Sequence, residues 1–195
     1  MTETSTPRKR RRTGRARSGG GSVKARRKAA RLAAVQALYQ IDVNGTPING
    51  KSVEAVLIEF IEHRLGAPVD EAEEQTLVAA DPQLFADIVR GACHRREQVD
   101  GLAAAALEPR HALERLEAPL RAILRAGAFE LSSDMATPAA ILISEYVDVA
   151  HAFYAGREPG MVNGVLDSIA KTVRAGGAEP ALGADDDEDD DSDDE

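Results

Sequence analysis

Apolar residues along this chain recur every three to four positions, which is the spacing of one face of an α-helix. Six stretches show this stripe or an Ala-rich, helix-favouring composition: 23–39, 52–65, 81–107, 119–131, 138–153 and 161–175. No stretch alternates between apolar and polar residues as a half-buried strand would. The pattern therefore predicts an all-α fold, a helical bundle of about six or seven helices.

Residues at the ends of these stretches indicate where helices begin. Asp81 followed by Pro82 is a capping residue followed by a proline at the first helical position. Ser52 is expected to cap the second helix, and the stretch 81–107 is expected to form one continuous helix. The stretch 119–131 is apolar nearly all round, so we predict that it is the most buried helix of the bundle.

Charge divides the chain into three regions. The overall formal charge is -9, yet residues 1–31 carry twelve Lys or Arg against one acid, and residues 185–195 carry ten acids and no base. We therefore expect a disordered basic arm over 1–22, a folded domain over 23–177 and a disordered acidic tail over 178–195. A basic arm attracts polyanions, of which nucleic acid is the commonest.

Composition argues against several classes of protein. Cys93 is the single cysteine, and the histidines show no metal-ligand spacing, so we expect neither a disulfide nor a metal or other cofactor. Glu145 and Asp148 are interpreted as a solvated polar face rather than as a catalytic pair. With no secretory signal and no apolar stretch that could span a membrane, the chain is expected to be a cytoplasmic protein that is not an enzyme.

The start of the first helix carries the sharpest functional signal. Four cations lie within an arc of about 100° at 3.6 residues per turn: Lys24, Arg27, Lys28 and Arg31. The same stripe continues through Val35, Leu38 and Tyr39. One face of the helix is therefore cationic in its first turns and apolar in its later turns. We interpret the apolar half as an anchor and the cationic half as a projection that contacts phosphates. The other interpretation is a solvated helix end with no ligand.

Several motifs resemble the NusB family. The first helix matches through the segment 25–39, with Arg26, Arg27, Lys28 and Arg31 followed by Val-Gln-Ala-Leu-Tyr. The stretch 123–131 (Ile-Leu-Arg-Ala-Gly-Ala-Phe-Glu-Leu) is similar to the family's central helix. The stretch 162–167 (Val-Asn-Gly-Val-Leu-Asp) is similar to its most specific motif. The likeness covers roughly residues 23–175.

This resemblance implies a bundle of two packed helical halves that binds single-stranded boxA RNA of ribosomal RNA leaders. It also implies a complex with NusE, a small-subunit ribosomal protein, within an antitermination complex on RNA polymerase. The RNA-contacting positions of the family correspond to Arg27, Lys28 and Arg31 in this chain. Lys24 and Arg26 flank them and are further candidates for RNA contact. The family further implies that the start of the last helix lies near the RNA. Met161 and Asn163 are therefore added to the candidate RNA-contacting residues.

Three departures from the family pattern bear on RNA contact. Met161 stands where the family usually has an aromatic residue, Ser144 replaces a common Asn, and Ala29 occupies a position that is often Arg. The long charged ends resemble those of actinobacterial members.

Two other functions remain open at this point. The chain could be related to the NusB-like domain of rRNA cytosine methyltransferases, although its length leaves no room for a catalytic domain. It could also bind nucleic acids generally through its charged ends. The sequence does not decide between a monomer and a homodimer.

Overall fold

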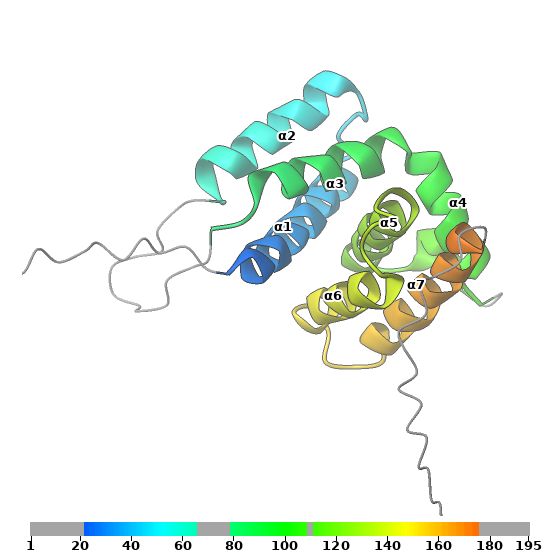
Figure 1. Cartoon of the computed structure of the whole chain (residues 1–195). Helices are drawn as coiled ribbons and strands as arrows, with labels where there is room; N and C mark the ends of the chain where they lie inside the picture. Colours follow the sequence, from blue (N-terminus) through cyan, green and yellow to red (C-terminus); the bar gives the residue numbers. More distant parts are fainter. Residues whose placement is uncertain (1–21, 66–78, 109–110, 176–195) are drawn as a thin grey trace, which may run out of the picture.

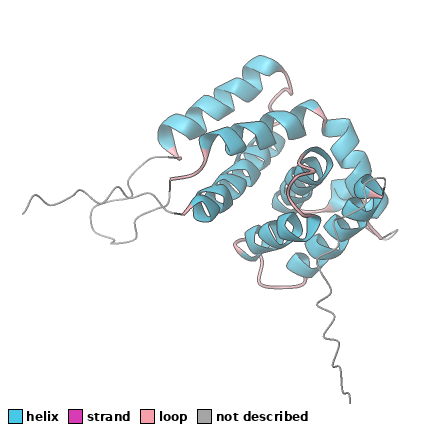
Figure 2. Ribbon diagram, in the orientation of Figure 1, coloured by secondary structure: helices cyan, strands magenta, loops and turns pink. Residues whose placement is uncertain are grey.

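The computed structural model describes residues 22–65, 79–108 and 111–175. Within these ranges the chain forms only helices, joined by short loops and one 3-10 turn, η1 (Leu113–Arg115) (Figure 2). The helices are α1 (Val23–Val43), α2 (Gly50–His63), α3 (Pro82–His94), α4 (Arg96–Ala106), α5 (Ala118–Ser133), α6 (Ala139–His151) and α7 (Glu158–Arg174). The all-α prediction is confirmed. The predicted basic arm, apart from Ser22, and the acidic tail lie outside the described residues.

Helix α5 occupies the centre of the bundle. It contacts α1 and α3 on one side and α4, α6 and α7 on the other (Figure 1). Every residue from position 122 to 131 is buried, including two charged ones, Arg125 and Glu130. The prediction that this stretch is the most buried helix is confirmed, because α5 packs against neighbours all around its circumference.

Two glycines allow helices to approach closely at the core. A Cβ at Gly127 would lie 2.8 Å from a methyl carbon of Leu166, so α5 and α7 can meet at this spacing only without a side chain there. A Cβ at Gly91 would overlap the Phe129 ring at 2.0 Å, which fixes α3 against α5 in the same way.

Side-chain caps account for three helix starts. Ser22 accepts a hydrogen bond from the backbone N–H of Ala25, and Asp81 accepts from those of Gln83 and Leu84. The predicted start at Asp81 is thus confirmed. The predicted cap Ser52 is wrong: Asn49 caps α2 and accepts from the Ser52 N–H at 3.0 Å. The chain turns into the helix three residues earlier, and Ser52 is itself helical.

The stretch predicted as one helix over 81–107 is two helices. The break falls at Arg95, whose backbone angles (φ -103°, ψ 27°) leave the helical region. A straight helix of that length would extend about 40 Å along a single direction. The break lets α3 pack on α1 while α4 turns to pack on α5 and α7. Smaller differences occur at α1, which continues past Tyr39 to Val43, and at α7, which begins at Glu158.

A group of ion pairs joins the carboxyl end of α1 to α4 and α5. Asp42 lies 2.7 Å from Arg96, 2.6 Å from Arg121 and 3.1 Å from Arg125. Burial opposes ionisation of this carboxyl. The hydrogen bonds from Arg121 and Arg96 and the charge of Arg125 outweigh that effect and lower its pKa from 3.8 to about 2.

Replacing this carboxylate should destabilise the fold in a pH-dependent way. Asp42→Asn should lower the free energy of unfolding by about 3 kcal/mol at pH 7, because three guanidiniums lose their partner. The folded-state pKa is depressed, so the stabilisation is present above about pH 4 and is lost as the pH falls through about 2. Urea unfolding at several pH values measures the difference.

The exposed Asp87 provides the control. Asp87→Asn removes an acid that, in the described residues, accepts a surface bond from Gln83 and adds a negative charge near the exposed Arg90, so its effect should stay within about 0.5 kcal/mol. An Asp42→Asn penalty of the same size at pH 2 as at pH 7 would contradict the account.

Candidate nucleic-acid interface

The first two turns of α1 form an exposed basic end, which we call the basic tip and define as Lys24, Arg26, Arg27 and Lys28. Ser22 caps this end, which extends beyond the contacts that bury the helix from Ala30 onward. Lys24, Arg26 and Lys28 are exposed, and the Arg27 side chain is 39% exposed. These four predicted RNA-contacting residues are therefore all at the surface of one helix end, with Lys24, Arg27 and Lys28 on one face and Arg26 outside that arc.

Arg31 does not belong to this surface. Its side chain is 4% exposed, and its Nε and Nη2 donate to the two carboxylate oxygens of Glu130 at 2.8 and 3.0 Å. Its Nη1 lies 3.5 Å from Glu145 on α6. The predicted surface position of Arg31 is wrong, because two carboxylates hold its guanidinium beneath the surface.

This buried ion pair is well partnered. Tyr146 is fully buried and donates its hydroxyl hydrogen to Glu130 at 2.7 Å. Burial, and then the adjacent Glu130 carboxylate, raise the pKa of Tyr146 well above its usual value, so it remains a donor. Burial tends to lower the pKa of Arg31, but the bond and charge of Glu130 raise it overall. No buried side-chain nitrogen or oxygen in the described part of the chain lacks a hydrogen-bond partner.

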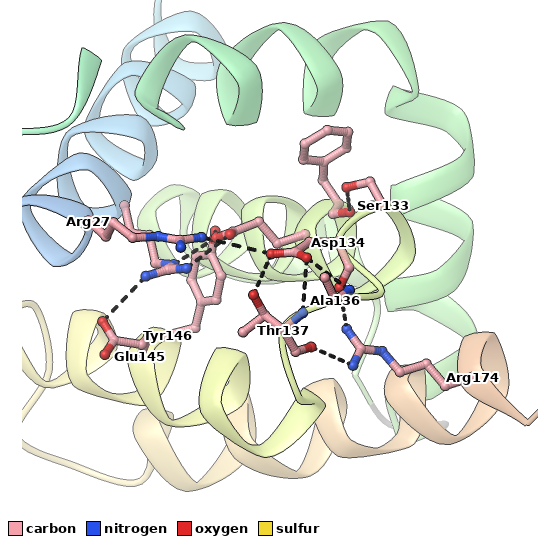
Figure 3. Close-up of polar contacts among 11 residues, drawn as sticks. Arg27, Ser133, Asp134, Ala136, Thr137, Glu145, Tyr146 and Arg174 are labelled. Carbon is pink, nitrogen blue, oxygen red and sulfur yellow. Dashed lines mark hydrogen bonds and ion pairs between the residues drawn. The ribbon is translucent and has the colours of Figure 1, made fainter. Parts of the chain in front are cut away.

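Arg27 lies beside the turn between α5 and α6. Its Nη2 is 3.9 Å from Asp134, the residue that directly follows α5 (Figure 3). Asp134 accepts bonds from the backbone N–H groups of Ala136 and Thr137 and from the Thr137 hydroxyl. Arg174 at the end of α7 donates to the backbone carbonyls of Asp134 and Thr137, each at 2.8 Å. The turn is thus braced, and it presents a fixed edge beside Arg27.

The interpretation of Glu145 and Asp148 as one solvated face is wrong for Glu145. Glu145 is buried against Arg31, whereas Asp148 is exposed and accepts a 2.6 Å hydrogen bond from Lys28 Nζ. Both acids face α1 because α6 packs beside the first half of that helix. Glu145 helps to hold α6 against α1 from within the core, whereas Asp148 meets Lys28 at the surface.

Met161 and Asn163 lie on the other side of α6. Asn163 is exposed inside α7 and borders a groove of about 780 Å³ between α6 and α7, together with Ser144 and Lys171. Met161 is partly buried and packs against the core. The structure therefore does not join these two predicted site residues to the basic tip. No signal in the sequence shows this, because the separation arises from the fold, in which α6 packs against both α1 and α7.

An exposed cluster of cations at the end of a helix anchored in an all-α bundle is typical of a nucleic-acid-binding protein. Within the described residues no three acidic, histidine or cysteine side chains are arranged to hold a metal ion. None of the helices described here is both long and apolar enough to cross a membrane.

Comparison with known proteins agrees with this class. The model of the NusB family matches residues 28–171. The transcription antitermination protein NusB of Novosphingobium aromaticivorans is 48% identical over 148 residues, which are 76% of this chain and 95% of that protein. Its namesake from Rhizobium etli is 48% identical over 149 residues, 76% of this chain and 88% of that protein. The chain belongs to the NusB family.

Solved structures show the same fold. NusB of T. maritima superposes with a TM-score of 0.56 at 25% identity, over 74% of this chain and 90% of that one. A chain from a crystal structure of NusB and NusE in complex with dsRNA superposes with a TM-score of 0.57 at 23% identity. The superposition covers 77% of this chain and 98% of that one.

The buried position of Arg31 leads to a stability prediction. Arg31→Ala should lower the free energy of unfolding by about 4 kcal/mol, because Glu130 is left buried without its cation. Arg26→Ala, one turn away on the surface, should change it by less than about 0.5 kcal/mol. Urea unfolding followed by circular dichroism compares the two. Equal effects would show that the Arg31 guanidinium is solvated.

Proposed function

We propose that this chain is a transcription antitermination factor that binds boxA RNA of ribosomal RNA leaders together with NusE. The observation that carries the proposal is the basic tip, four cations on the exposed end of a helix in a chain of the NusB family. Phosphate contacts from Lys and Arg supply most of the affinity of such surfaces. The relatives bear the name of an antitermination protein, so the chain is a transcription factor and not an enzyme.

The individual contacts follow from the exposure of each side chain. Lys24, Arg26 and Lys28 present charges to solvent, and Arg27 presents a partly exposed guanidinium. Arg31 supports them from below by holding α1 against Glu130. Asn163, in the groove beyond α6, is proposed as a second contact for an RNA that crosses α6. Met161 packs against the core and is proposed to shape the surface beside it.

The partners follow from the family. A complex with NusE is supported by the similar NusB chain solved with NusE and RNA. Assembly on RNA polymerase in the cytoplasm follows from an action on nascent transcripts. The homodimer left open by the sequence is a further proposal, to be tested by sedimentation of the free protein.

Of the two other functions that the sequence left open, one is now disfavoured and one remains an alternative. The relatives at 48% identity match along most of their own length and are antitermination proteins. This match favours the antitermination family over the NusB-like domain of a methyltransferase. General binding through the charged ends concerns residues outside the described ranges and stays an alternative.

Removing two exposed cations should weaken RNA binding. Lys24→Ala with Arg26→Ala should reduce affinity for boxA RNA about tenfold near 0.1 M salt. The slope of log affinity against log salt should become shallower by about 1.4, which is 0.7 for each lost phosphate contact on a single strand. Fluorescence anisotropy at several salt concentrations measures both quantities.

A matched pair of cations provides the control. Lys51, near the start of α2, and Arg115, in η1, lie toward the far end of α1, about 30 Å from its start. Lys51→Ala with Arg115→Ala changes net charge equally and should leave affinity within twofold. Equal losses in both double variants would show that overall charge, and not the basic tip, governs binding.

Competition and partner experiments separate specific binding from binding by the charged ends. The intact chain should prefer boxA RNA over a scrambled RNA of equal length at equal salt, and adding NusE should tighten binding to boxA. An equal affinity for both RNAs would favour the charged ends. An unchanged affinity with NusE would remove that partner from the proposal.

A further inference from the structure

Two cations of the basic tip already face carboxylates of the same chain. Arg27 lies 3.9 Å from Asp134, and Lys28 lies 2.6 Å from Asp148. A phosphate that binds either cation must compete with an acid already beside it. The two acids therefore affect whatever the basic tip binds.

The two acids differ in what else they do. Both oxygens of Asp134 are engaged by the turn before α6, so this residue has a structural role that does not depend on Arg27. Asp148 is 48% exposed, and its one side-chain hydrogen bond in the described structure comes from Lys28. It lies in the last turn of α6 (Ala139–His151), and none of the described hydrogen bonds makes it a helix cap.

The Lys28–Asp148 pair contributes little to the fold. Both side chains are about half exposed, at 49% and 48%. Such a surface pair stabilises a protein only slightly, because water and salt screen it. The hydrogen bond from Lys28, together with the positive charges of Lys28, His151 and Lys24, lowers the pKa of Asp148, so it is ionised at neutral pH. A permanent negative charge thus lies beside Lys28, one of the cations that we assign to RNA.

We infer that Asp148 limits the affinity of the basic tip for RNA by occupying the ammonium group of Lys28. The inference rests on the proposed function, which supplies the RNA. In the free protein Lys28 is bound to a carboxylate, and in the complex the phosphate takes its place. Asp148 is then left beside an anion, so each complex loses part of the affinity that the cations provide.

The variant Asp148→Asn tests this directly, because it keeps the shape of the side chain and removes its charge. Affinity for boxA RNA at 50 mM salt should rise about threefold, the size expected for removing one like charge roughly 6 Å from a phosphate in water. The gain should diminish toward 0.5 M salt, where exposed charges are screened. Urea unfolding should show that the variant is as stable as the parent.

The control is Glu54→Gln. Glu54 pairs with Arg90 at 2.6 Å, with side chains 45% and 48% exposed, so it matches the Lys28–Asp148 pair in distance and exposure. The pair joins α2 to α3, away from the contact between α1 and α6. Its neutralisation makes the same change in net charge and should leave RNA affinity within about 1.3-fold.

A third variant tests the route through Lys28. In a Lys28→Gln background, Asp148→Asn should yield less than half of the logarithmic gain in affinity that it yields in the parent. An undiminished gain there, an Asp148→Asn affinity equal to that of Glu54→Gln, or a loss of affinity would each overturn the inference. A parent chain that does not bind boxA RNA would instead overturn the proposed function, so the two failures are distinguishable.

Discussion

The buried contact between Arg31 and Glu130 determines how the first helix lies on the rest of the bundle. Two parallel hydrogen bonds fix the guanidinium to α5, Tyr146 donates to the same carboxylate, and Glu145 approaches from α6. Removing one partner would leave a charge buried without compensation, which is far costlier than losing a surface pair. The contact therefore aligns α1 with both helices, and it places the basic tip one turn farther along at a defined edge.

The helices were predictable from sequence because each buries one apolar stripe. The α5 stretch was also correctly predicted as the most buried, since apolar residues surround it. The break at Arg95 was not predictable from that pattern, because the stripe continues through it. It arises from tertiary packing: α3 follows α1, while α4 must turn to cover α5 and α7.

The candidate site was only partly predictable. Periodicity correctly placed Lys24, Arg27 and Lys28 at an exposed helix end, but it grouped the buried Arg31 with them. Val35 and Leu38 continue the stripe of Arg31 and are buried, so the same face had to turn inward where the helix enters the bundle. The buried acid that partners it, Glu130, lies in an otherwise apolar stretch, and no local pattern connects the two positions. Likewise, only the fold shows that α6 separates Asn163 from the basic tip.

The central claim is that Arg31 is a structural residue while the cations before it meet the RNA. The most direct measurement is an NMR titration with boxA RNA that follows the Arg31 Nε–H signal alongside the backbone amides of residues 24–28. The account predicts that Arg31 Nε–H stays hydrogen-bonded and protected from exchange with solvent while the amides of 24–28 shift. Loss of that protection as RNA is added, with Arg31 showing the largest change, would contradict it.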